Sequence, residues 1–191
     1  AVQYPMPNEL PDTHWYERTR VFLIDYECGQ AGIAAAKIAR THKIPVVSDI
    51  EGRTQYATEA MAMSTHLVVS EDFAKTYTAK VDINDMLQAL RTFDDQTVII
   101  TRGIDGCAGI GPEGYFTLPA YKVDAIDTTG CGDTFHGAFA LAIARKMKVI
   151  EAAKFASAAA ALCATKIGGR DGIPNREQLE IFMKSNNVTT F

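Results

Sequence analysis

The chain has 191 residues, of which 47% are hydrophobic and 22% charged, and its formal net charge is −4. These values are typical of one globular domain with a sizeable core, and the mildly acidic balance offers no basic surface for nucleic acid or an anionic membrane. The longest apolar run, 156–164, is too short to span a bilayer, and no secretory signal opens the sequence. We therefore expect neither a nucleic-acid nor a membrane partner.

Cysteine usage indicates a reducing compartment. The four cysteines show no C-x-x-C pair and no ligand-like histidine spacing; they are Cys28, Cys107, Cys131 and Cys163. Separate, reduced thiols in a cytoplasmic protein are therefore expected.

The first half of the chain alternates short apolar runs with amphipathic stretches. Buried strands are predicted at 21–26, 46–50, 66–70 and 97–101, and helices at 31–42, 53–63, 71–77 and 82–93. This alternation is typical of βαβ units and of a parallel sheet covered on both sides. Ligands of such sheets bind outside the carboxyl ends of the strands, which directs attention to Asp49, Ser70–Glu71 and Thr101–Gly106.

After Gly106 the pattern changes. The runs 107–111 and 115–119 flank the turn Pro112-Glu113-Gly114, which predicts an antiparallel hairpin. The elements expected next are an extended stretch at 121–126, a glycine-rich turn at 128–132, helices at 131–146 and 150–167, and a last helix opened by Pro174-Asn175. No repeat or linker divides the sequence, so we expect a single domain over 1–191.

The most informative segment is AIDTTGCGDTFHGAF, residues 125–139. Gly130 and Gly132 allow a close backbone approach, and the free N–H groups at the start of the following helix favour an anion. Asp133 places one carboxylate beside that site. Exposed amides next to a carboxylate suit phosphoryl transfer, in which the carboxylate accepts the hydroxyl proton. The alternative is a purely structural helix start.

The run D-T-T-G-C-G-D at 127–133 resembles the second signature of the PfkB, or ribokinase-like, carbohydrate kinases, D-T-x-G-A-G-D. The resemblance implies that Asp133 is the catalytic base beside the substrate, and that the backbone of Gly130, Cys131 and Gly132 forms the anion hole. Cys131 departs from the usual alanine, which should be tolerated because only its amide is needed. A reactive thiol at Cys131 is the alternative.

Two further segments resemble the nucleotide site of the same family. VIITRGIDG, 98–106, is similar to its strand and loop T-x-G-x-x-G, which implies that Thr101, Gly103 and Gly106 lie beside ATP. ASAAAALCATKIGGRDGIP, 156–174, is similar to the stretch that packs against adenine, where Ser157 would contact the nucleotide with Gly132. The simpler interpretation of the small residues 158–161 is helix packing.

The resemblance also implies metal ions. Some members hold a monovalent cation such as K⁺, and the matching positions are Asp127, Thr129 and the carbonyls of Cys163, Lys166, Gly168 and Gly172. Gly172 stands where a side-chain hydroxyl is common, and the alternative for Asp127 is a hydrogen-bonded turn aspartate.

The family's N-x-x-E element for Mg²⁺ is replaced here by Ser70-Glu71-Asp72. Glu71 is then expected to reach Mg²⁺ through water. The alternative is that Glu71 and Asp72 only favour a helix start.

Four other side chains have weaker signals. Asp25 ends the first predicted strand where family members touch the sugar, so it is a candidate substrate contact. His136 is expected to be a packed or capped histidine. A role in a triad or as a proton shuttle is the alternative. Arg102 and Arg170 are expected to be solvated surface residues, with contact to phosphates as the alternative.

The resemblance covers about Val21 to Phe182 and implies a three-layer ribokinase-like α/β fold: a mostly parallel sheet with flanking helices and an antiparallel hairpin. Family members are longer, and their N-terminal part carries a first signature G-G-x-x-N and a small β-sheet lid that often dimerises. Neither is found here, so we expect an N-terminally truncated chain whose longer form dimerises through the lid.

The expected function is that of an ATP- and Mg²⁺-dependent kinase that phosphorylates a hydroxyl of a small sugar or sugar derivative. A degenerate nucleotide-binding module and a nucleoside kinase of the same fold stay open as alternatives. A Rossmann dehydrogenase would need G-x-G-x-x-G after the first strand, where residues 28–32 read CGQAG. The segments FHGAF and GGRDGIP most resemble those of bacterial sugar or sulfosugar kinases.

Overall fold

The computed structural model describes residues 7, 10, 12, 14–52 and 55–186. Their contacts divide the chain into two compact units. The sheet unit comprises residues 1–102 and 107–117, and the helical unit comprises residues 103–106 and 118–191. The single domain expected from the sequence stays a prediction.

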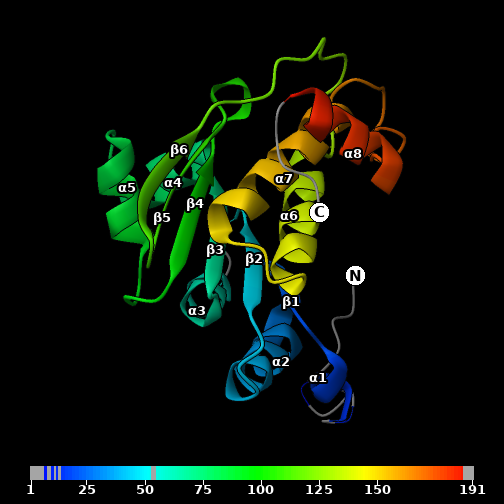
Figure 1. Ribbon diagram of the computed structural model, residues 1–191. Helices are drawn as coiled ribbons and strands as arrows, with labels where there is room; N and C mark the ends of the chain where they lie inside the picture. Colours follow the sequence, from blue (N-terminus) through cyan, green and yellow to red (C-terminus); the bar gives the residue numbers. More distant parts are fainter. Residues whose placement is uncertain (1–6, 8–9, 11, 13, 53–54, 187–191) are drawn as a thin grey trace. The chain divides into compact units, whose positions relative to one another are not determined.

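Six strands of the sheet unit form one sheet in the order β1-β2-β3-β4-β5-β6 (Figure 1). Their bounds are Phe22–Asp25, Val46–Ile50, His66–Ser70, Thr97–Thr101, Cys107–Gly111 and Gly114–Leu118. Strands β1 to β4 are parallel, and β5 runs antiparallel to β4. The mostly parallel sheet with a hairpin is therefore confirmed.

The register aligns the carboxyl ends of the parallel strands at one edge of the sheet. Asp25 pairs with Asp49 at the ends of β1 and β2, and Ser70 pairs with Thr101 at the ends of β3 and β4. This is the edge at which ligands of parallel sheets bind, and the predicted residues Asp49, Ser70 and Thr101 lie on it.

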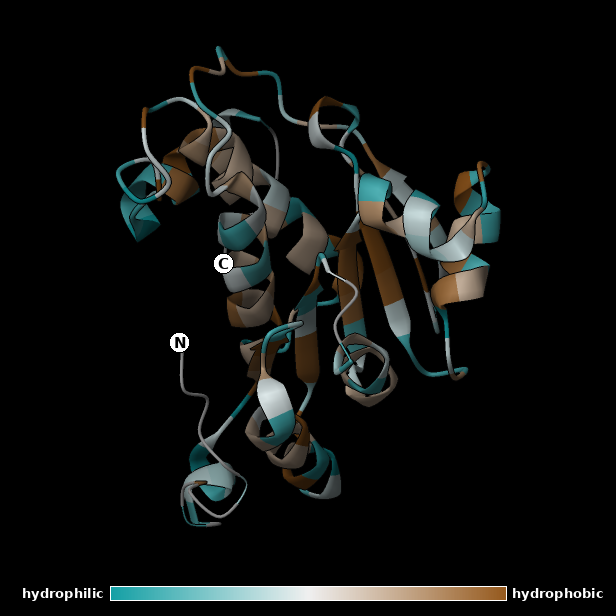
Figure 2. Ribbon diagram, turned by 180° about the vertical axis from the view of Figure 1, so that it is seen from behind, coloured by the Kyte–Doolittle hydropathy of each residue, from teal (hydrophilic) through white to brown (hydrophobic). Residues whose placement is uncertain are grey.

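The helices of the sheet unit share one hydrophobic core with the strands. They are α1, α2, α3, α4 and α5, with the bounds His14–Arg18, Gly29–Thr41, Ala57–Met63, Glu71–Thr78 and Ile83–Leu90. Alternate strand residues, such as Leu67 and Val69 of β3, join this core, while Val68 between them is also fully buried. The central strands β3 and β4 accordingly contain continuous apolar stretches, which burial on both faces favours (Figure 2).

Local sequence explains where these helices begin. Asp82 caps α5 through hydrogen bonds from the amides of Asn84 and Asp85, and Ser70 caps α4 by accepting from Phe73. The predicted helix 53–63 is α3, which begins at Ala57; residues 53 and 54 lie outside the described residues.

The helical unit contains a short 3₁₀ turn, η2 (Gly103–Asp105), and the helices α6 (Cys131–Ala144), α7 (Val149–Cys163) and α8 (Arg176–Ser185). Helices α6 and α7 pack against each other. Ala158 and Ala159 of α7 are buried, as the packing interpretation of the alanines requires. A capping box between Asn175 and Gln178 starts α8, where Pro174-Asn175 predicted it.

Residues 121–126, expected as an extended stretch, form neither helix nor strand, and the amides of Ile126 and Asp127 donate to the carbonyl of Ala164 beyond the end of α7. The expected end of α7 was wrong. Helix α7 ends at Cys163 and not near Ile167, and the chain then turns towards Gly168, whose φ is +90°.

None of the helices in the described ranges has both the length and the apolar character that a membrane span requires.

Candidate functional site

Helix α6 begins at a turn that only glycine fits well. Gly130, its N-cap, has φ +74° and ψ +5°. A Cβ atom on Gly130 would lie 2.7 Å from the carbonyl oxygen of Gly169 and 2.8 Å from its Cα. Both the left-handed conformation and the close backbone contact therefore require glycine here.

The first turn of α6 presents two backbone amides without partners. Within the described part of the chain, the N–H groups of Gly132 and Asp133 make no hydrogen bond, as expected for the first residues of a helix. The amide of Cys131 donates to the carbonyl of Thr128 at 3.2 Å. The structure thus favours Gly132 and Asp133 as anion-binding amides, and the helix dipole adds to their effect.

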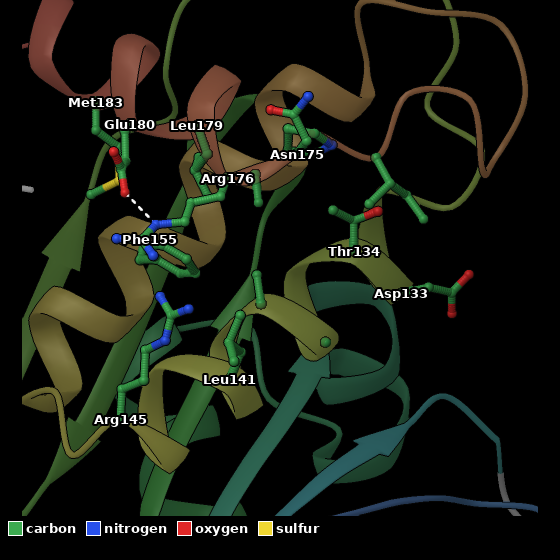
Figure 3. Close-up of a pocket in the computed structure, with 15 residues that line it drawn as sticks. Asp133, Thr134, Leu141, Arg145, Phe155, Asn175, Arg176, Leu179, Glu180 and Met183 are labelled. Carbon is green, nitrogen blue, oxygen red and sulfur yellow. Dashed lines mark hydrogen bonds and ion pairs between the residues drawn. The ribbon is translucent and has the colours of Figure 1, made fainter. Parts of the chain in front are cut away.

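The Asp133 carboxylate is accessible. The residue is exposed, and its carboxylate makes no hydrogen bond or ion pair within the described residues. Figure 3 shows the carboxylate pointing away from α7 and α8 at the edge of a pocket. A hydroxyl that approaches from solvent can therefore reach an acceptor oxygen directly beside the free amides.

The pocket that Asp133 borders has a volume of about 360 Å³ and lies among α6, α7 and α8. Its lining is mainly apolar, with Leu141, Phe155 and Leu179 among its residues. Thr134 lines it too, with a buried hydroxyl that has no hydrogen-bond partner within the described residues. Sequence reasoning did not identify this pocket, because its residues come from three separate helices.

A second segment, after α7, holds the turn in place. One oxygen of the Asp127 carboxylate accepts the amide of Thr129 at 2.9 Å, and the other accepts the amide of Gly168 at 2.8 Å. These hydrogen bonds hold the pKa of Asp127 below its ordinary value. Asp127 therefore stabilises the turn through hydrogen bonds, and a role as a cation ligand stays a prediction.

The other positions matched to a cation lie in the same region. Lys166 donates its amide to the carbonyl of Cys163, and a Cβ atom on Gly172 would lie 2.3 Å from that carbonyl oxygen. The backbone of Cys163 leaves no space for a side chain at position 172, so close packing explains why glycine replaces the usual hydroxyl residue there. Cation binding itself stays a prediction.

The thiol of Cys131 lies within hydrogen-bonding reach of the thiol of Cys163, although both are free. Burial first, then the neighbouring thiol, raises the pKa of Cys131 to about 11. The thiolate is therefore scarce near neutral pH, which argues against the reactive-thiol alternative. The sequence spacing gave no sign of this contact.

Both glycines of the T-x-G-x-x-G loop have a positive φ, and Gly106 also lies close to neighbouring backbone. Gly103 and Gly106 have φ of +56° and +84°, and the amide of Gly106 donates to the carbonyl of Gly103. A Cβ atom on Gly106 would lie 2.0 Å from the carbonyl oxygen of Leu118. In the sheet unit, the Thr101 hydroxyl donates to the carbonyl of Val69. Nucleotide contact by these residues stays a prediction.

The remaining predicted residues have local roles. Glu71 pairs with Lys75 at 3.2 Å and with Arg102 at 3.6 Å, so Arg102 is not the solvated arginine that we expected. Asp25 accepts the amide of Glu27 through its carboxylate. Ser157 is half-buried on α7.

Comparison with known proteins identifies the family. Residues 15–176 match the pfkB family carbohydrate kinases. The chain belongs to this family. The run D-T-T-G-C-G-D, with the turn at Gly130 and the accessible Asp133, lies within the matched residues, and its role as the family's signature stays a prediction.

Two curated relatives and one solved structure show the extent of this similarity. The chain is 29% identical to aminoimidazole riboside kinase of Salmonella typhimurium (98% of this chain, 65% of that protein) and 27% identical to ribokinase of Bacillus subtilis (86% and 55%). A similar solved structure is that of aminoimidazole riboside kinase from Salmonella enterica, complexed with aminoimidazole riboside and an ATP analogue. It matches with a TM-score of 0.80 and 27% sequence identity, and the match covers 94% of this chain and 67% of the chain of that structure. The ribokinase-like fold is thus confirmed, and the chain spans about 55 to 65% of the length of these two curated relatives.

Proposed function

We propose that this chain carries the phosphoryl-transfer half of an ATP-dependent kinase that phosphorylates a hydroxyl of a sugar or sugar derivative. The observation that supports this proposal most strongly is the start of α6. There the partner-free amides of Gly132 and Asp133 lie beside the exposed, partner-free carboxylate of Asp133, in a chain of the pfkB family.

Each group has a distinct role in the proposed reaction. The Asp133 carboxylate accepts the proton of the acceptor hydroxyl, whose oxygen then bonds to the γ-phosphorus of ATP as the bond to ADP breaks. The amides of Gly132 and Asp133, together with the α6 dipole, stabilise the charge on the transferred phosphoryl group. The products are ADP, a phosphate ester and the proton on Asp133, which is released to water.

The nucleotide is assigned to the loops that follow the strands and to α7. Thr101, Gly103 and Gly106 would line the phosphates and ribose, and Ser157 would contact the nucleotide. The positive φ at both glycines supports close backbone approach, as such a role requires. The relative solved with an ATP analogue supports ATP as the donor.

The acceptor is proposed to be ribose or a riboside. The relatives include a ribokinase and an aminoimidazole riboside kinase, which are named for these two kinds of acceptor. A nucleoside kinase of the same fold is therefore a variant of the proposal rather than a rival. Dimerisation through the lid of a longer form and a cytoplasmic location stay predictions.

The carboxylates matched to metal ions already have partners in the protein. Glu71 is engaged by Lys75 and Arg102, so a water-mediated contact with Mg²⁺ would have to share its carboxylate with these cations. Asp127 uses both oxygens for backbone amides, which fits turn stabilisation better than ligation of K⁺. When bound, Mg²⁺ would supply charge compensation for the nucleotide phosphates.

Acceptor-dependent release of ADP tests the proposed function. The chain would be incubated with ATP, Mg²⁺ and either K⁺ or tetramethylammonium, with ribose, fructose, aminoimidazole riboside or no acceptor. We expect ADP to form faster with at least one acceptor than without any. ATP binding with no acceptor-dependent turnover would instead identify a nucleotide-binding module, and absence of ATP binding would contradict the proposal altogether.

A further inference from the structure

His136 lies one helical turn after the candidate anion site, on a buried side of α6. The residue is 3% exposed, and its Nδ1 atom lies 2.8 Å from the carbonyl oxygen of Gly132. Because a carbonyl oxygen can only accept, Nδ1 must carry a proton and donate it to this bond. The imidazole is therefore tied to the first turn of the helix in a defined tautomer.

The carbonyl that His136 holds belongs to the same planar peptide as the amide of Asp133. In a trans peptide the C=O and N–H bonds point in opposite directions, so fixing the oxygen of Gly132 also fixes the direction of the Asp133 N–H. The helical i→i−4 pattern brings the backbone amide of His136 to the same oxygen, which has lone pairs for both donors.

This peptide lies in a glycine-rich helix start, with Gly132 on one side of it and Asp133 on the other. Gly130 and Gly132 have no side chains to restrict their dihedral angles, so the first turn of α6 is intrinsically adaptable. The bond from His136 is shielded from water, and a hydrogen bond is stronger in such surroundings than at the surface. A side chain from one turn further along thus limits the motion of the peptide that offers the free amide.

We propose that His136 is a positioning residue that holds the Gly132–Asp133 peptide so that the Asp133 amide faces the transferred phosphoryl group. His136 acts through this peptide and does not touch the phosphate. The inference rests on the proposed function, because the orientation of the amide matters only if that amide binds phosphate.

Two substitutions separate the N–H donor from the ring. His136→Phe keeps an aromatic ring and removes the donor, whereas His136→Asn removes the ring and keeps an N–H donor as many bonds from Cα as Nδ1. ATP affinity is measured by NMR titration of the 191-residue chain, following the amide signals of Gly132 and Asp133. We expect His136→Phe to weaken ATP binding about threefold to tenfold, the usual worth of one hydrogen bond, and His136→Asn to stay within about twofold of wild type.

Phe139→Leu is the matched control, since Phe139 is fully buried on the same helix and lies beyond the turn. It should lower the Tm without changing ATP affinity. In wild type, the ¹⁵N spectrum of the imidazole should show a protonated Nδ1. If His136→Phe does not fold, His136→Leu takes its place and decides the question.

Three results would each overturn the inference while leaving the proposed function intact. They are wild-type ATP affinity in the donor-free variant, an asparagine variant as weak as the phenylalanine one, and an Nδ1 atom without a proton. If the wild-type signals of Gly132 and Asp133 did not respond to ATP, the proposed function would be contradicted instead, and the inference with it.

Discussion

Among single residues, Gly130 and Gly137 show how differently two glycines of the same region are constrained. Gly130 has φ +74° and touches the Gly169 backbone, whereas a Cβ atom on Gly137 within α6 would have no neighbour within 4 Å. The first glycine therefore determines the geometry of the site, and the second leaves the helix less stable than alanine would.

Gly130→Ala should lower the free energy of unfolding by about 2 kcal/mol or more, because a left-handed alanine costs about 1–2 kcal/mol before the contact with Gly169 is relieved. Gly137→Ala is the matched control and should raise the free energy of unfolding by roughly 0.5–1 kcal/mol. Urea unfolding of both variants measures the difference. Equal stability of the two variants would show that the turn at Gly130 is not constrained as described.

The identity of the site residues could be predicted from the sequence, but their partners could not. Asp133, Gly130 and Gly132 stand in a contiguous run whose chemistry is local to one helix start. The contact of Gly130 with Gly169 and that of Cys131 with Cys163 depend on how distant segments pack. No local pattern encodes such contacts.

At the level of elements, the turn before α6 and the segment after α7 are joined by Asp127. Its carboxylate reaches Gly168, 41 residues further along the chain, in addition to Thr129. Both donors are backbone amides, so each needs an acceptor oxygen, and the ionised carboxylate supplies both. Protonation of Asp127 would therefore weaken its hydrogen bonds to both Thr129 and Gly168.

The lowered pKa of Asp127 predicts acid sensitivity. A carboxyl group whose folded pKa is depressed adds stability that is present above its ordinary value of 3.8 and is lost as pH falls through the lower folded value. We expect Asp127→Asn to show a smaller fall in Tm than wild type between about pH 4 and pH 2. Asp124→Asn, at an exposed position, should behave like wild type. Parallel Tm curves for wild type and Asp127→Asn would contradict this role.

Strands were predicted more accurately than helix ends. The run 46–50 coincides with β2 and the run 66–70 with β3, because each contains a short stretch of buried β-branched or apolar residues bounded by polar ones. The end of α7 was predicted wrongly: the helix stops at Cys163, and the carbonyl of Ala164 just beyond it accepts the amides of Ile126 and Asp127. Apolar periodicity contains no information on such bonds.

At the scale of the whole molecule, stability should depend on pH through His66 on β3. Burial lowers the pKa of His66 from 6.5 to about 4. Between these values the unfolded chain binds a proton that the folded chain does not, so stability present at neutral pH is lost as pH falls.

Wild type should therefore lose up to about 3 kcal/mol of unfolding free energy between pH 6.5 and pH 4 through this residue. His66→Asn should remove most of that slope while leaving the slope below pH 4, where Asp127 titrates. Chemical denaturation at several pH values measures both. An unchanged slope in His66→Asn would exclude His66 as its source.

The central claim is that Asp133 accepts the proton of the acceptor beside a phosphate held by main-chain amides. It is tested most directly by the rate of acceptor-dependent ADP release in Asp133→Asn, with ATP affinity measured in the same preparation and Asp124→Asn as the control. We predict that Asp133→Asn loses at least ~100-fold in rate, the usual effect of removing a general base, while ATP affinity and the control rate stay near wild type. A rate for Asp133→Asn close to that of wild type would contradict the account.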